Sequence, residues 1–312
     1  MNPPNPISDP AASFEPHRRR LLGLAYRMLG SMSDAQDAVQ ESYLRWHAVE
    51  RDKVSESKAF LMTTTTRICL DILNSARARR EEYVGQWLPE PVLDTSALSP
   101  DNHVELAEDL SLALLLTLDR LSPLERAAFL LHDVFDFSFS EVATALQRSE
   151  AACRQLAARS RANVRAARPR GGTPPPSSGE VDAKHAQLLS AFSAAVASGD
   201  LKVLTQLLAA DARIITDGGG NVRSALNAIE GADRVAQFLV DVTRKRPGAW
   251  WRDEFSVRFA LVNGLPGVVV DSPAGPVQTT VFEIEDDVIN ALYVVRNPDK
   301  LRHLAVGTTQ QP

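Results

Sequence analysis

The stretch PRGGTPPPSSG at residues 169–179 most constrains how this chain of 312 residues can fold. It offers no large apolar side chain for a core, and its prolines and glycines prevent a regular helix or strand. The residues on either side of it must therefore build separate cores. Three further prolines, Pro89, Pro91 and Pro100, interrupt helical periodicity at residues 83–102 and divide the first part into two blocks.

Apolar residues in the first block recur at spacings of three and four, which predicts helices over residues 14–29, 33–49 and 55–80. Ser33 is expected to cap the second helix, because a serine hydroxyl can accept from the backbone of the first turn. The third helix contains the β-branched run 63–66, which favours a helix poorly, so packing must hold it helical. The first block is thus predicted to be a three-helix domain.

Serine caps mark the helices of the second block. Ser122 and Ser138 are each followed three residues later by a glutamate, which is the capping-box pattern. Ser149 can cap a further helix that runs to about Arg165. Because about three residues separate the last two helices, they are predicted to form a helix-turn-helix.

The last of these helices has two distinct faces. Small and apolar residues from Cys153 to Val164 recur at helical spacing and are expected to pack on the neighbouring helices. Arg154, Gln155 and Arg159 lie away from that face and offer donors to guanine edges and phosphates in a major groove. A basic surface helix that enters no groove is the alternative.

Charge is unevenly distributed, although the net charge of −5 by itself argues against a polyanionic partner. Residues 67–80 carry four arginines and one aspartate, and residues 148–170 carry seven arginines and one glutamate. Between them, residues 81–136 carry twelve acidic residues and two arginines. Two basic patches suggest contact with a phosphate backbone at two places, and solvated helix faces are the alternative.

The rest of the composition predicts a cytoplasmic protein that contacts no membrane. The two cysteines, Cys69 and Cys153, make a disulfide framework improbable. Residues 1–16 contain no apolar run that could start a signal peptide or anchor, and the leucine-rich stretch 110–118 is too short to span a bilayer.

The third block mixes helical and strand patterns. Alternating runs late in the block predict an antiparallel meander. This order suits a cone-shaped α+β domain, a fold that often encloses a pocket, so an unknown small ligand is a candidate partner. The expected helices are 181–197, 201–208 and 232–244, and the expected strands are 213–216, 255–262, 268–271, 277–284 and 288–296.

The third block shows no pattern typical of catalysis. Its only histidines, His185 and His303, lie far apart, and no spacing suggests a metal site, a cofactor site or a nucleophile triad. Asp217 could act as a general base if buried in a pocket, but before three glycines it is interpreted as a turn residue. A non-catalytic domain is therefore expected.

Two segments carry a family resemblance. The segment SDAQDAVQESYLRW at residues 33–46 is similar to the polymerase-binding helix of the extracytoplasmic-function group of bacterial sigma factors. Residues 138–161 are similar to the promoter-reading helix-turn-helix of the same group. One departure is Gln147, where the family turn usually has glycine, and a positive φ there would cost glutamine about 1 kcal/mol.

Three further motifs narrow the resemblance to a subgroup with a fused SnoaL-like C-terminal domain. They are YVGQWLPEP at residues 83–91, DGGG at 217–220 and NPDK at 297–300. In that subgroup the extra domain is taken to regulate the sigma module. The resemblance thus implies a multidomain chain with two all-α sigma domains, the second a helix-turn-helix domain, followed by an α+β domain.

The implied boundaries and sites can be stated by residue. Sigma region 2 spans residues 10–83, a linker 84–104, sigma region 4 residues 105–168, a flexible linker 169–180 and the SnoaL-like domain 181–312. The residues implied to bind the clamp helices of core RNA polymerase are Asp37, Gln40, Glu41 and Arg45. Those for the minus-ten element are Arg67, Asn74, Arg77 and Arg80, and those for the minus-thirty-five element are Ser149, Arg154, Gln155 and Arg159. The regulatory motif residues are Trp87, Pro89, Glu90, Pro91, Asp217, Gly218, Gly219, Gly220, Asn297, Pro298, Asp299 and Lys300.

The resemblance predicts a sigma factor that directs RNA polymerase to promoter DNA, with the C-terminal domain as a built-in regulator. We expect the stiff stretch 87–91 to bind near residues 217–220 and 297–300. Two alternatives remain at this point: a one-component transcription regulator with a ligand-binding domain, and a SnoaL-like isomerase or cyclase fused to a DNA-binding module.

Overall fold

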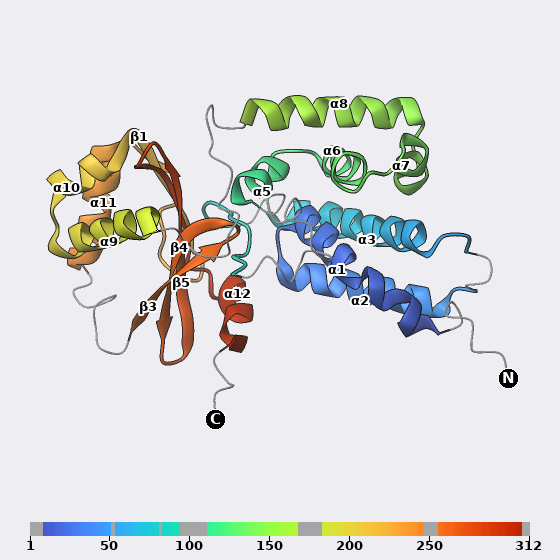
Figure 1. Ribbon diagram of the computed structural model, residues 1–312, viewed down its shortest axis with the longest axis horizontal. Helices are drawn as coiled ribbons and strands as arrows, with labels where there is room; N and C mark the ends of the chain where they lie inside the picture. Colours follow the sequence, from blue (N-terminus) through green and yellow to red (C-terminus); the bar gives the residue numbers. More distant parts are fainter. Residues whose placement is uncertain are drawn as a thin grey trace. The chain divides into compact units, whose positions relative to one another are not determined.

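The computed structural model describes residues 9–50, 54–80, 83–93, 111–167, 183–245 and 255–307 (Figure 1). The chain separates into two compact units, Met1–Glu82 with Thr95–Pro169, and Tyr83–Asp94 with Arg170–Pro312. Residues predicted to begin the linker 84–104 therefore group with the C-terminal unit, and the linker 169–180 lies outside the described residues. Among the helices described, none combines the length and apolarity needed to cross a membrane.

Three helices open the first unit: α1 (Pro10–Leu29), α2 (Met32–Ala48) and α3 (Ser57–Arg80). Helix α1 ends at Gly30, which adopts a left-handed conformation with φ 66°. Ser31 then caps α2 by accepting from the backbone N–H of Asp34 at 3.1 Å. The predicted cap, Ser33, is wrong, because α1 ends only two residues before α2 begins and Ser31 offers the first hydroxyl.

The threonine run 63–66 is helical, as expected. Thr65 and Thr66 are fully buried in α3. The hydroxyl of Thr65 lies 2.8 Å from that of Ser42 in α2, and the hydroxyl of Thr66 donates to the carbonyl of Met62 at 2.8 Å. Packing and satisfied hydroxyls thus outweigh the poor helix propensity of β-branched residues.

The second group of helices comprises α5 (Leu112–Asp119), α6 (Pro123–Phe129), η3 (Leu130–Val134), α7 (Phe139–Leu146) and α8 (Glu150–Ala167). Both predicted capping boxes are present, at Ser122 and at Ser138. The helix that begins at Ser122 widens after Phe129 into the π-helical turn η3. The chain therefore stays helical to Val134, although its α-helical part ends at Phe129.

Helices α7 and α8 form the predicted helix-turn-helix. Gln147 ends α7 in the left-handed region, with φ 54° and ψ 48°. The predicted small face of α8, which includes Cys153, Ala157 and Ser160, is fully buried. The hydroxyl of Ser160 donates to the carbonyl of Glu125 in α6 at 2.8 Å, so α8 packs closely on α6.

The C-terminal unit is an α+β domain built on one six-stranded sheet. Its strand order is β2-β1-β6-β5-β4-β3. The last four strands form the predicted antiparallel meander, whereas β1 pairs with β6 in parallel and β2 pairs with β1, neither of which was anticipated. The strands are β1 (Leu208–Asp217), β2 (Ile229–Glu230), β3 (Ser256–Val262), β4 (Leu265–Ser272), β5 (Gly275–Glu285) and β6 (Val288–Val295).

Three helices cover one face of this sheet: α9 (Ala183–Ser198), α10 (Leu201–Leu207) and α11 (Ala232–Lys245). They share a core with inward residues of the strands, including Ile214, Phe282 and Leu292. On the other side of the strands lie α12 (Pro298–Leu301) and η4 (Arg302–Gly307), which contact β5 (Figure 1). Because side chains alternate along a strand, the two faces of β1 and β6 can serve different sites.

Candidate functional site

A buried carboxylate, that of Asp217 at the end of β1, is the centre of a polar cluster in the C-terminal unit. Its side chain is 0% exposed and forms an ion pair with Nζ of Lys300 at 2.7 Å, where the lysine side chain is 8% exposed. It also accepts from the hydroxyl of Tyr83 at 2.5 Å and from the backbone N–H of Leu88 at 2.9 Å. Two partners of Asp217 thus belong to residues 83–93, which we term the strap.

Lys300 binds the strap a second time. Its ammonium group donates to the carbonyl of Leu88 at 2.5 Å and lies 4.3 Å from the ring centroid of Trp87. Asp217 accepts from the backbone N–H of Leu88, and Lys300 donates to the backbone carbonyl of Leu88. One buried ion pair thus satisfies both backbone polar groups of a single strap residue. An ion pair this buried is favourable only when such additional hydrogen bonds accompany it.

Local backbone geometry places the two charges together. The carboxylate of Asp217 accepts from the N–H of Gly219 at 3.1 Å, which fixes the turn after β1, so the expected turn role was correct but incomplete. The carbonyl of Asp217 accepts from the N–H of Asn297 at 3.1 Å. Asn297 caps α12 through the N–H of Asp299, and Pro298 stands at the first helical position. The turn after β6 therefore delivers Lys300 to the end of β1.

Glycine is required in the turn after β1. Gly219 has φ 62°, and a Cβ atom there would lie 2.2 Å from the side-chain nitrogen of Asn297. A Cβ atom at Gly218 would lie 2.1 Å from the carbonyl oxygen of Val222. Gly220 has φ 76° and lies beside Val84 of the strap. The DGGG motif thus permits β1, the turn and α12 to approach closely.

The C-terminal half of the strap contacts the opposite edge of the domain. Val92 exchanges two hydrogen bonds with Asn263 in the β3–β4 turn, one from Asn263 N–H at 2.8 Å and one to its side-chain oxygen at 3.2 Å. The ring of His303 in η4 lies 2.7 Å from the carbonyl of Pro91 and 3.8 Å from the carboxylate of Glu90. The buried middle of the strap consists of Leu88, Pro89, Glu90 and Pro91. Hydrogen bonds therefore hold the strap on both sides of this buried stretch.

Tyr83, Asn263 and His303 were not among the predicted strap contacts. Burial, followed by the hydrogen bond to Asp217, raises the pKa of Tyr83 above its ordinary value, so the phenol stays protonated and donates. The Asn263-Gly264 pair is a hairpin-turn signal in the sequence, and both residues have positive φ. No sequence signal, however, links that turn to a segment more than 160 residues earlier.

The predicted polymerase-binding residues lie on one polar face of α2. Asp37, Gln40 and Arg45 are exposed, and Glu41 is half-buried. Arg45 pairs with Glu41 at 3.0 Å. Leu44 beside them is 54% exposed. A charged face that also presents a large apolar side chain is suited to a protein partner.

The predicted minus-ten residues on α3 differ in their surroundings. Asn74 is exposed, and the side chains of Arg77 and Arg80 lie outside the described part of the structure. Arg67 instead donates to two backbone carbonyls at the end of α7, to Ala145 at 3.0 Å and to Thr144 at 2.7 Å. In this conformation Arg67 therefore joins the two helical domains of the first unit.

The predicted minus-thirty-five residues line an exposed side of α8. The hydroxyl of Ser149 accepts from the N–H of Ala152 at 3.2 Å and caps the helix. Arg154 is exposed, pairs with Glu150 at 2.8 Å and lies over the ring of Phe139 at 4.6 Å. Gln155 is exposed, and Arg159 pairs with Glu125 at 3.2 Å. Surface pairs of this kind are weak, so a nucleic acid can displace them at little cost.

Three comparisons with known proteins fit these helical domains. The family Sigma-70 region 2 matches residues 14–79, and Sigma-70, region 4 matches residues 111–164. The ECF RNA polymerase sigma factor SigJ of Mycobacterium tuberculosis is 39% identical over 299 residues, which cover 93% of this chain and 92% of SigJ. This chain belongs to the extracytoplasmic-function family of RNA polymerase sigma factors.

A further sequence relative and a solved structure support the same family for this sigma factor. The probable ECF RNA polymerase sigma factor SigI of Mycobacterium tuberculosis is 29% identical over 96% of this chain and 97% of SigI. The crystal structure of Mycobacterium tuberculosis SigJ superposes with a TM-score of 0.70 at 33% identity, over 93% of this chain and 97% of that chain. The predicted order of two helical sigma domains followed by an α+β domain is confirmed.

Membership in the family decides the general function of this sigma factor. It acts in promoter-specific initiation of transcription, with RNA polymerase core and promoter DNA as its partners. The one-component regulator and the tethered enzyme are not favoured.

Proposed function

We propose that the α+β domain regulates initiation by holding the strap, which lies in the chain between the two sigma regions. The buried Asp217–Lys300 pair, which binds both polar groups of Leu88, carries this proposal. Sigma regions 2 and 4 match residues 14–79 and 111–164, so residues 83–93 occupy part of their connection. A held strap shortens the free connection and restricts the distance between the two promoter-reading domains.

Within region 2, the exposed polar face of α2 is proposed to dock on the clamp helices of the largest polymerase subunit. Asp37, Gln40, Glu41 and Arg45 supply the charges, and the exposure of Leu44 supports a protein contact there. Asn74, Arg77 and Arg80 on α3 are proposed to bind the minus-ten element. Arg67 donates from Nε and Nη2 to carbonyl oxygens of α7, so in this conformation only its remaining N–H groups can join them.

Helix α8 is proposed to enter the major groove of the minus-thirty-five element. Ser149 and Arg159 would position the helix on phosphates, while Arg154 and Gln155 reach base edges. We expect Arg154→Ala to weaken binding of the preferred element by about 1–3 kcal/mol and to relax its sequence preference. Binding to a library of minus-thirty-five sequences measures this.

Arg165→Ala provides a matched control, since Arg165 is exposed at the far end of the same helix. It is expected to lower affinity evenly across sequences through a lost phosphate contact, without a change in preference. An unchanged preference profile for both Arg154→Ala and Gln155→Ala would contradict the assignment of α8 as the reading helix.

The α+β domain is proposed to act without catalysis. A cavity of about 630 Å³ lies between its sheet and its helices, and the described residues that line it include no Asp, Glu, His, Lys, Cys or Tyr. General acid–base or nucleophilic chemistry needs such a group within hydrogen-bond reach of a substrate.

We also propose that the protein works in the cytoplasm, where RNA polymerase and promoter DNA are found.

Run-off transcription with purified core polymerase tests the regulatory proposal. Lys300→Met removes the donor that binds Leu88 and Asp217, and should change promoter-dependent initiation severalfold relative to the natural chain. Lys184→Met is the matched control, because Lys184 is exposed and its pair with Asp287 lies at the surface. Equal initiation by all three chains, with Lys300→Met folded, would refute regulation through the strap.

A further inference from the structure

The cavity of the α+β domain is large enough to hold a small molecule. Its volume of about 630 Å³ lies within the range of 300–1,000 Å³ typical of ligand sites. Residues of α9 and α11 form one wall, and strands β1, β3, β4, β5 and β6 together with residues 223–225 form the other. The polymerase and promoter contacts proposed above do not use this cavity.

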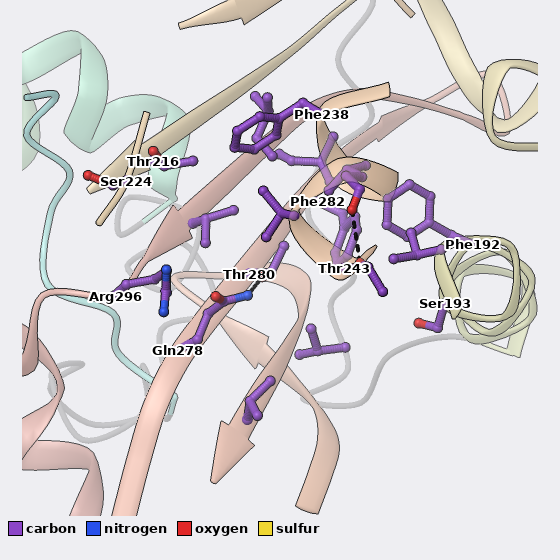
Figure 2. A pocket seen from close by; sticks show the side chains of 18 of the residues that line it. Phe192, Ser193, Thr216, Ser224, Phe238, Thr243, Gln278, Thr280, Phe282 and Arg296 are labelled. Atoms are coloured by element: carbon purple, nitrogen blue, oxygen red, sulfur yellow. Dashed lines mark hydrogen bonds between the residues drawn. The ribbon is translucent and has the colours of Figure 1, made fainter. Parts of the chain in front are cut away.

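Most of the cavity wall is apolar. Phe192 of α9, Phe238 of α11 and Phe282 of β5 turn their rings toward it (Figure 2). On the outermost strand β3, Val257 and Phe259 also line it and remain 47% and 48% exposed. These two residues lie two positions apart on the same strand, so together they give the cavity an apolar edge that is open to solvent.

One side of the cavity is polar and positively charged. Figure 2 shows Arg296, Gln278 and Thr216 on the side away from Phe192. Arg296 donates one hydrogen bond from Nη1 to the carbonyl of Arg223 at 2.8 Å, which fixes its side chain. Arg223 and Arg296 are the charged residues among those that line the cavity, and acidic residues are absent from that lining.

We propose that this cavity binds an amphipathic carboxylate, with a long aliphatic or polycyclic body among the phenylalanines and the acid group at Arg296. Apolar surface removed from water contributes roughly 25 cal/mol per Å², so a long body supplies most of the affinity. A guanidinium group binds a carboxylate through two parallel hydrogen bonds and compensates the charge that enters the site. A purely polar anion would leave the phenylalanine-lined part unfilled.

The acid end of the cavity adjoins the residues that hold the strap. Thr216 faces the cavity, whereas Asp217, next in the same strand, faces the strap. Arg296 lines the cavity and Asn297, next in the chain, caps α12, while the N–H groups of both donate to the carbonyl of Asp217. A ligand at Arg296 therefore contacts a residue whose backbone binds Asp217 and whose chain neighbour caps the helix that carries Lys300. The binding proposal itself does not depend on the regulatory proposal.

Titration calorimetry on the full chain tests the proposal with dodecanoate and with dodecanol, which has the same body without the charge. Dodecanoate is expected to bind with one site per chain, and dodecanol at least tenfold more weakly. Arg296→Gln should weaken dodecanoate binding tenfold or more and abolish its advantage over dodecanol, while Arg296→Lys should retain part of it. Arg234→Gln, an exposed arginine of α11 outside the cavity lining, should bind like the natural chain.

Ser193→Trp distinguishes the cavity from nonspecific surface binding. Ser193 lines the cavity from α9, so an indole there fills the space and should eliminate dodecanoate binding while the circular dichroism spectrum stays unchanged. The proposal is overturned if dodecanoate does not bind the natural chain, or binds the folded Ser193→Trp chain equally well. It is also overturned if dodecanol binds as tightly as dodecanoate and Arg296→Gln changes neither affinity.

Discussion

Gln147 occupies a backbone conformation that suits glycine better than glutamine. With φ 54° it ends α7, and its own N–H donates to the carbonyl of Ala143. Gln147→Gly is expected to raise the free energy of unfolding by about 1 kcal/mol, because glycine adopts this region without a Cβ penalty. Urea unfolding followed by far-UV circular dichroism measures the change.

A second glycine variant serves as the control for Gln147→Gly. Gln155 is exposed within α8, where glycine should instead lower stability by roughly 0.5–1 kcal/mol. Opposite signs for the two variants would show that the local backbone conformation, and not the loss of a glutamine side chain, decides the effect. Destabilisation by Gln147→Gly would contradict the strain at this turn.

Lys300 compensates a fully buried carboxylate, so its removal should be costly. Lys300→Met is expected to destabilise the α+β domain by about 3 kcal/mol, because Asp217 then keeps a charge without its ionic partner. Adding Asp217→Asn to that variant should cost less than the sum of the two single changes, since the pair acts as a unit. Guanidinium unfolding of the four chains provides the test, and additive losses would contradict a direct interaction.

At the scale of elements, Arg67 joins α3 to α7 within the first unit. Arg67→Ala removes two hydrogen bonds to α7 carbonyls, which should raise hydrogen exchange of α7 amides about tenfold, equivalent to about 1.4 kcal/mol. Asn74→Ala, an exposed change on the same helix, should leave that exchange unaffected. If α7 exchanges equally in the natural chain and in Arg67→Ala, the two bonds do not stabilise the contact.

Local signals in the sequence predicted most elements, because their causes lie within a few residues. The capping boxes at Ser122 and Ser138 are present as expected. The cap of α2 was wrong because two serines lie two residues apart, and the end of α1 decides between them.

The strap site could be anticipated only through the motif resemblance. Asp217 and Lys300 are separated by 83 residues, and Leu88 and Asp217 by 129. Periodicity cannot report contacts at such separations, nor the parallel pairing of β1 with β6. For the same reason, nothing in the sequence indicated that Arg67 binds the end of α7.

At the scale of the whole molecule, the proposed regulation acts through the strap, which lies in the chain between the two sigma regions. A chain ended before Asn297 lacks α12 and Lys300, and Trp87→Ala removes the ring that lies over the lysine ammonium. Both should change promoter-dependent run-off transcription in the same direction, severalfold for the truncated chain and less for Trp87→Ala. The truncated chain loses every bond made by Lys300, whereas Trp87→Ala leaves the bonds to Asp217 and Leu88 in place.

A chain ended after Gly307 is the matched control for the truncation, because it retains α12 and η4 and should initiate like the natural chain. The effect of releasing the strap should also depend on promoter spacing, since a freer connection lets the two reading domains adopt more separations. Promoters with one base pair added or removed between the two elements should therefore be used better by the truncated chain than by the natural one. Unchanged transcription by both variants at every spacing would remove the strap from the control of this sigma factor.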